Sequence, residues 1–138
     1  MSNILGLRIM VVEDEFWIAE DLAQALTEVG VEVIGPICNV GEAIERLREK
    51  QPVDGAVLDI NVSGVSVYPL AEDLMHRGVP FVFTTGYDMD TIPESLRQIA
   101  RIEKPSDPAK IIRELALAVE QAPRSNFGAL PSPLEGAQ

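Results

Sequence analysis

The stretch GAVLDINVSG, residues 55–64, decides how the rest of the chain is interpreted. An apolar run suited to a buried strand ends in the carboxylate of Asp59, and the polar residues Asn61 and Ser63 follow closely behind it. Burying a charge costs free energy unless the group is paired, hydrogen-bonded or bound to a metal. Asp59 must therefore emerge at a surface or have partners elsewhere in the chain.

Size and charge narrow the setting. The chain has 138 residues, 46% of them hydrophobic, which predicts one globular domain with a core. Its net charge of −11 disfavours direct binding to nucleic acid or an anionic membrane and favours cations or basic surfaces. Cys38 stands alone, so no internal disulfide is possible, and we interpret it as a small buried hydrophobic residue. Neither a signal peptide nor a membrane-spanning stretch is visible, which favours the cytoplasm.

Five short apolar runs alternate with helical patterns along the chain. The runs predict strands at 8–12, 31–35, 53–58, 79–84 and 101–103. Asn39 is suited to cap the second helix, and the last helix is expected to begin at Asp107 and Pro108. A shorter helical segment that carries Leu96 and Ile99 begins at Pro93. The sequence after residue 122 is rich in Pro, Ser and Gly and lacks periodicity. We therefore expect a domain over residues 1–122 and a disordered tail or linker remnant over residues 123–138.

The alternation of strands and helices predicts an α/β fold. In a chain of this length it indicates a flavodoxin-like, doubly wound parallel sheet of five strands in the order 2-1-3-4-5, with helices on both faces. Ligands bind such sheets at the carboxyl ends of the strands, at the switch point between the first and third strands. Glu13 and Asp14 follow the first strand and Asp59 ends the third. Asp59 is therefore expected at a functional edge, facing two further carboxylates.

The same edge should carry a hydroxyl and an ammonium group. FTTGYD, residues 83–88, brings Thr85 out of the fourth strand, and EKPSD, residues 103–107, brings Lys104 out of the fifth. Converging carboxylates repel one another unless a cation neutralises them, and their oxygens suit Mg²⁺. Together with Thr85 and Lys104 they form a set suited to a metal and a phosphate. Taken alone, the acidic residues 13–15 could equally be a solvated helix start.

In this order and spacing, the chain resembles the receiver domain of two-component response regulators over about residues 5–122. The resemblance rests on the acidic pair after strand one, the Asp after strand three, the Thr after strand four and the Lys-Pro pair after strand five. The fourth strand also resembles, more narrowly, the FATGUY subgroup, which reads Phe-Ala-Thr-Gly-bulky-Tyr. Here Thr84 stands in place of the Ala and Asp88 in place of the final Tyr.

The resemblance implies a single-domain, CheY-like response regulator of the cytoplasm rather than an enzyme in the ordinary sense. Asp59 would accept a phosphoryl group from a sensor histidine kinase or a histidine phosphotransfer protein. Thr85 and Lys104 would contact the phosphoryl oxygens, so that the domain assists its own phosphotransfer and dephosphorylation. The implied Mg²⁺ ligands are Asp14 and Asp59 directly, Glu13 through water, and the backbone carbonyl of Asn61. Phosphorylation would then control contacts with a downstream protein that the sequence does not identify.

Two other classes stay open at the level of sequence. A small phosphatase of the haloacid dehalogenase type also uses an Asp nucleophile with Mg²⁺, but it needs a second Asp two residues later, where this chain has Asn61. An inactive, receiver-like binding module would keep the fold without carrying phosphate.

One position departs from the family. Receivers commonly carry an aromatic residue three positions before the Lys, where this chain has Arg101. Because a guanidinium is costly to bury, we expect the usual aromatic rotamer switch to be absent. We expect the loop at residues 86–91 to reorder instead when Thr85 closes over the phosphate.

Overall fold

A computed structural model describes residues 3–86 and 92–122 of the chain. The expected disordered tail, residues 123–138, and all but the first residue of the loop at residues 86–91 lie outside the described residues. Within the described ranges, no helix combines the length and the apolar character needed to cross a membrane.

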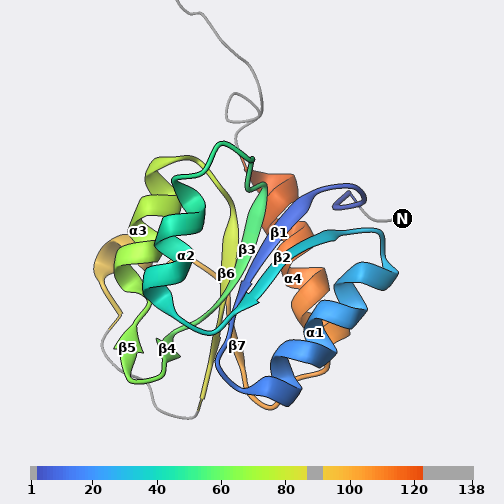
Figure 1. The fold of residues 1–138 in the computed structure, drawn as a ribbon, viewed down its shortest axis with the longest axis horizontal. Helices are drawn as coiled ribbons and strands as arrows, with labels where there is room; N and C mark the ends of the chain where they lie inside the picture. Colours follow the sequence, from blue (N-terminus) through green and yellow to red (C-terminus); the bar gives the residue numbers. More distant parts are fainter. Residues whose placement is uncertain (1–2, 87–91, 123–138) are drawn as a thin grey trace, which may run out of the picture.

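A parallel sheet of five strands runs through the centre of the molecule (Figure 1). Its strands are β1 (Arg8–Val12), β2 (Glu32–Ile37), β3 (Gly55–Asp59), β6 (Phe81–Thr85) and β7 (Arg101–Glu103). They pair in the order β2-β1-β3-β6-β7, and every pairing is parallel. Counted along the chain, this is the predicted order 2-1-3-4-5. β3 and β6 are buried at every position, as strands covered on both faces should be.

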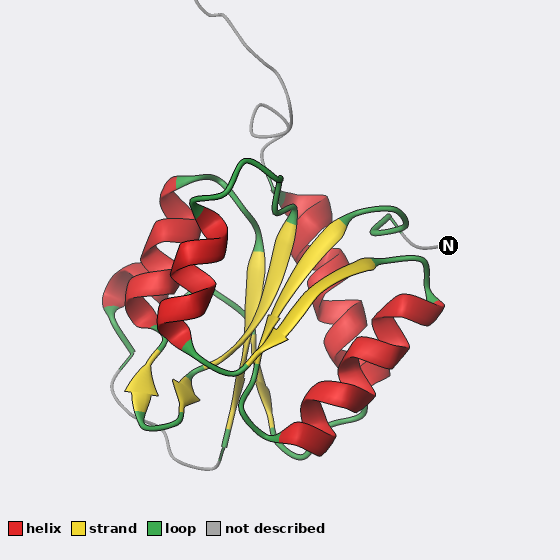
Figure 2. Cartoon of the chain, viewed as in Figure 1, coloured by secondary structure: helices red, strands yellow, loops and turns green. Residues whose placement is uncertain are grey.

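Helices cover both faces of the sheet (Figure 2). α2 (Val40–Leu47) and α3 (Tyr68–His76) lie on one face, and α1 (Phe16–Glu28) and α4 (Pro108–Gln121) lie on the other. Successive side chains of a strand point to opposite faces, so the sheet divides the core into two clusters. Met10 and Leu58 pack toward α2 and α3, whereas Val11 and Val57 pack toward α1 and α4.

The cap predicted at Asn39 and the helix start predicted at Asp107 are both confirmed. The side chain of Asn39 accepts a hydrogen bond from the backbone N–H of Glu42 at 2.9 Å, and α2 begins at the next residue. The side chain of Asp107 accepts one from the backbone N–H of Ala109 at 2.9 Å, at the start of α4. Each cap satisfies a donor that the first turn of a helix leaves without a partner.

The segment after Pro93 differs from its prediction. It forms a single turn of 3-10 helix, η1 (Glu94–Leu96), whereas the apolar spacing predicts a helical segment that begins at Pro93 and carries both Leu96 and Ile99. Leu96 is fully buried and Ile99 is half-buried, so the apolar pattern describes burial correctly. The backbone cannot continue the helix because β7 begins at Arg101, and the chain needs the intervening residues to enter the sheet.

The second strand and Cys38 also differ from expectation. β2 continues through Pro36 to Ile37, two residues beyond the predicted end, with a shift of its register against β1. Cys38 follows the end of this edge strand and is exposed, so its interpretation as a buried residue is wrong. Its apolar neighbours misled the prediction because burial ends where the strand leaves the sheet.

A small hairpin after β3 was not predicted. It pairs β4 (Asn61–Val62) with β5 (Val65–Ser66) in antiparallel fashion, and α3 follows it. Ser63 and Gly64 form its turn, both with positive φ, of 53° and 80°. The hairpin lies at the carboxyl edge of the sheet, next to the end of β3 (Figure 1).

Candidate charged site at the carboxyl edge of the sheet

Three carboxylates meet where β1 and β3 end. Glu13 directly follows β1 and Asp59 is the last residue of β3, and each is only 4% exposed. Asp14 lies beside them and is exposed. One oxygen of each carboxylate lies within 4.8 Å of the others, in an arrangement that could hold a metal ion. The topology therefore brings together the acidic residues that the sequence placed at this edge.

Lys104 enters this acidic cluster from the loop after β7. Its Nζ lies 3.0 Å from Oε1 of Glu13, 3.0 Å from Oδ2 of Asp59 and 3.5 Å from Oε1 of Glu15. The Lys104–Pro105 peptide bond is cis. One ammonium group thus faces several carboxylates, and the cluster keeps an excess of negative charge.

The burial of this cluster changes its proton affinities. Burial, together with the nearby charge of Asp59, raises the pKa of Glu13 from 4.5 to about 7. The backbone N–H of Glu15, 3.0 Å from Glu13 Oε2, and the ammonium of Lys104 oppose this rise. For Lys104, burial acts to lower the pKa, but the hydrogen bonds and charges of Asp59 and Glu13 outweigh it and raise the pKa. Lys104 is therefore held firmly as a cation.

The backbone after Asp59 orients its side chain. The N–H of Asn61 donates to Asp59 Oδ1 at 3.2 Å, while Lys104 holds the other oxygen, Oδ2. The side-chain oxygen of Asn61 accepts the N–H of Gly64 at 2.9 Å and so closes the hairpin turn. Asp59 is thus fixed by a contact at each of its oxygens.

Thr85 also lies at this edge. It is the last residue of β6 and is 4% exposed. Its carbonyl accepts the backbone N–H of Lys104 at 2.8 Å, which ties the Lys104 loop to the end of β6. Its hydroxyl donates to the carbonyl of Gly86 at 3.1 Å.

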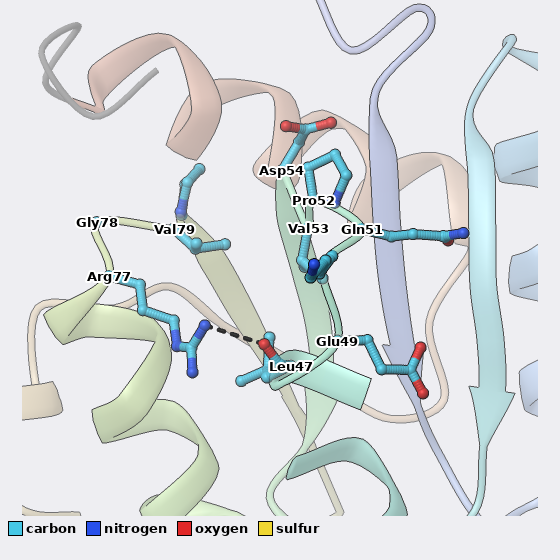
Figure 3. Close-up of a pocket in the computed structure, with 11 residues that line it drawn as sticks. Leu47, Glu49, Gln51, Pro52, Val53, Asp54, Arg77, Gly78 and Val79 are labelled. Atoms are coloured by element: carbon cyan, nitrogen blue, oxygen red, sulfur yellow. Dashed lines mark hydrogen bonds between the residues drawn. The ribbon is translucent and has the colours of Figure 1, made fainter. Parts of the chain in front are cut away.

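The size of a hollow does not identify the site. A cavity of about 190 Å³ adjoins the acidic cluster and is lined by Glu13, Thr84 and Lys104 together with apolar residues of α1 and α4. A larger hollow, of about 380 Å³, lies at the opposite, amino ends of β3 and β6 (Figure 3). There Arg77 donates to the carbonyl of Leu47 at 3.0 Å. The charged residues lining the larger hollow are of both signs, so it lacks the acidic excess of the carboxyl edge.

The chain is similar to proteins of two-component signalling, although no family model matches it. A solution structure of SdrG from Sphingomonas melonis Fr1 is 33% identical, with 82% of this chain and 98% of that one covered and a TM-score of 0.69. A crystal structure of a response regulator receiver protein from Sinorhizobium medicae covers 84% of this chain and 96% of its own, at 22% identity and a TM-score of 0.73. A response regulatory protein of Yersinia pestis is 37% identical over 84 residues, which are 59% of this chain and 35% of that protein.

The chain belongs to the response regulator receiver family. The matched part of the chain spans 35% to 57% of the lengths of these curated relatives. SdrG is also known in a BeF₃-activated conformation, to which the chain is 32% identical with a TM-score of 0.66. Membership of the FATGUY subgroup stays a prediction, because these relatives do not test it.

The site of this receiver domain contains two side-chain contacts that the sequence analysis does not predict. Ser63 donates from its backbone N–H and from its hydroxyl to Asp14 Oδ2, at 2.8 and 3.2 Å. Glu15, which the sequence suggested as part of a solvated helix start, forms an ion pair with Lys104. A Ser-Gly pair is a turn signal and could have predicted the hairpin. Nothing local in the sequence indicates either contact.

Trp17, at the start of α1, is 77% exposed and packs edge-to-face against Phe16 at a centroid distance of 5.0 Å. Arg101 is exposed at the beginning of β7, where its guanidinium remains in water. The expected absence of an aromatic rotamer switch stays a prediction.

Proposed function

We propose that the receiver domain accepts a phosphoryl group on Asp59 from the phosphohistidine of a sensor histidine kinase or a histidine phosphotransfer protein. Phosphorylation then controls its contacts with a downstream protein. One observation carries the proposal: the buried carboxylate of Asp59 is held 3.0 Å from Lys104 Nζ and within 4.8 Å of the oxygens of Glu13 and Asp14. A net charge of −11 supports a protein or a basic surface as partner, rather than nucleic acid or an anionic membrane.

The donor set fits Mg²⁺. Glu13, Asp14 and Asp59 offer hard oxygen atoms, and the exposure of Asp14 leaves room for the waters that Mg²⁺ retains. The backbone carbonyl of Asn61 is our fourth proposed ligand. Bound there, Mg²⁺ would offset the negative charge of both Asp59 and an incoming phosphoryl group.

The residues of the chain would divide the remaining work. An oxygen of Asp59 forms the new P–O bond as the P–N bond of phosphohistidine breaks, and the leaving imidazole keeps the electron pair of that bond. Lys104, which holds Asp59 Oδ2 before the reaction, moves its hydrogen bond to a phosphoryl oxygen. The Thr85 hydroxyl turns from the carbonyl of Gly86 to a second phosphoryl oxygen. The same contacts would assist hydrolysis of the aspartyl phosphate.

A haloacid dehalogenase-type phosphatase fits this site less well. Such an enzyme needs a general acid two residues after its nucleophile, and the residue there is Asn61. An amide is not acidic enough to transfer a proton at neutral pH, and the Asn61 side-chain oxygen accepts the N–H of Gly64 within the turn.

Incubation with acetyl phosphate and Mg²⁺, followed by intact-protein mass spectrometry, tests the proposal. We expect one phosphoryl group per chain and no adduct in Asp59→Asn. Asp54→Asn is the matched control, because Asp54 also accepts a backbone N–H but lies at the opposite end of β3. It should be phosphorylated like the wild type. An adduct that persists in Asp59→Asn would refute the assignment, and its absence from the wild type would favour an inactive binding module.

A further inference from the structure

Ser63, in the turn of the β4–β5 hairpin, is hydrogen-bonded to Asp14. Ser63 donates two hydrogen bonds to the same oxygen, Asp14 Oδ2, from its backbone N–H at 2.8 Å and from its hydroxyl at 3.2 Å. The two residues are 49 positions apart in the sequence. This contact therefore links the hairpin after β3 to the acidic loop after β1.

The backbone at Ser63 favours a different residue. Its φ is 53°, in the left-handed region, and it is followed by Gly64 with φ of 80°. Among the described residues, Ser63 is the one non-glycine residue with positive φ. Glycine would adopt this conformation with less strain. The hydroxyl that holds Asp14 gives a physical reason for serine at this position.

The geometry determines which Asp14 oxygen can bind a metal. A carboxylate oxygen has two lone pairs, and the two donors of Ser63 use both lone pairs of Oδ2. The oxygen that can face a cation is therefore Oδ1. The same hairpin also orients Asp59, because the N–H of Asn61 donates to Asp59 Oδ1. One short turn thus arranges two of the proposed metal ligands.

We propose that Ser63 is a positioning residue that holds Asp14 in the orientation needed for Mg²⁺. This inference rests on the metal site described under the proposed function. Mg²⁺ demands near-ideal octahedral geometry, whereas Ca²⁺ accepts flexible and irregular ligand sets. Loss of the Ser63 hydroxyl should therefore weaken the binding of Mg²⁺ more than the binding of Ca²⁺.

The test compares Ser63→Gly and Ser63→Ala with the wild type, using NMR shift titrations with Mg²⁺ and with Ca²⁺. Ser63→Gly suits the positive φ and keeps the backbone N–H, so its resistance to urea should match the wild type. Ser95→Ala is the matched control. The Ser95 hydroxyl also donates a hydrogen bond to a carboxylate, that of Glu72, at a distance of 2.8 Å, and this pair lies away from the metal site. We expect both Ser63 variants to lose Mg²⁺ affinity by about tenfold, with a smaller loss for Ca²⁺.

A double variant separates a positioning role from a general loss of structure. If Ser63 acts through Asp14, then Ser63→Gly should cause no further loss of Mg²⁺ affinity in an Asp14→Asn background. Unchanged Mg²⁺ affinity in both Ser63 variants, or equal losses for the two metals, would overturn the role of Ser63 and leave the proposed function standing. Failure of the wild type to bind Mg²⁺ would overturn the proposed metal site as well.

Discussion

The two ends of the sheet each bury a cation to the same extent, but they surround it differently. The side chain of Arg8, at the amino edge, is 18% exposed, and that of Lys104, at the carboxyl edge, is 16% exposed. Arg8 pairs with the carboxylate of Glu32, whose side chain is 64% exposed. Lys104 pairs with Glu13 and Asp59, whose side chains are 4% and 6% exposed.

This difference shows why one edge can be a site and the other is structural. The guanidinium of Arg8 also donates to the carbonyl of Pro52 and the side chain of Gln51, both of which are exposed. If Arg8 were removed, water could take its place as the hydrogen-bond donor to these groups. At the carboxyl edge, water has little access to the carboxylates of Glu13 and Asp59, and one ammonium cannot neutralise both of them together with Asp14. That acidic excess is what a metal ion would relieve.

Removal of the two cations should give the largest difference in stability between the two edges. We expect Lys104→Met to lower the free energy of unfolding at neutral pH by about 3 kcal/mol, because it leaves two buried carboxylates without their cation. Arg8→Met should cost about 1 kcal/mol or less, because its partners are exposed. Urea denaturation of both variants without metal measures the difference. Equal losses would mean that the burial of the partners does not matter.

Mg²⁺ should stabilise the carboxyl edge and leave the amino edge unaffected. At a concentration one hundred times its dissociation constant, a ligand specific for the folded state adds about 2.7 kcal/mol to the free energy of unfolding. We expect this gain in the wild type and in Asp54→Ala, and we expect Asp14→Ala to lose most of it. Thermal unfolding with and without Mg²⁺ gives the measurement. A full gain in Asp14→Ala would contradict a ligand role for Asp14.

The two edges should also differ in how their carboxylates make stability depend on pH. Because the pKa of Glu13 rises from 4.5 to about 7, the folded state binds its proton more tightly than the unfolded state does. The contribution of Glu13 to stability is therefore full below pH 4.5 and is lost as the pH rises through about 7. Each pKa unit is worth about 1.4 kcal/mol, so we expect a loss on the order of 2 kcal/mol once solvent access is allowed for.

Glu13→Gln should remove this part of the pH profile in metal-free protein, and Glu32→Gln at the amino edge should retain it. Urea denaturation between pH 4.5 and 8 provides both profiles. Parallel curves for the wild type and Glu13→Gln would show that Glu13 does not titrate as its burial implies.

Much of the fold could be predicted because it depends on local patterns. Apolar runs and helix caps such as Asn39 and Asp107 are properties of neighbouring residues, and strict alternation of strands and helices leaves few possible topologies. The segment after Pro93 shows the limit. Its apolar spacing is compatible with a helix, but the start of β7 at Arg101 restricts it to one turn.

The order of residues along the chain is enough to predict which chemical groups lie at the carboxyl edge. Glu13, Asp59 and Lys104 each stand at or directly after the end of an apolar run, and in a parallel sheet these ends share one edge. This placement does not depend on the details of packing. How these groups pair with one another depends on the packed fold. The hydrogen bonds from Ser63 to Asp14 and the exposure of Cys38 depend on how segments far apart in the chain lie relative to one another. Packing and burial set these positions, and no local pattern of residues encodes them.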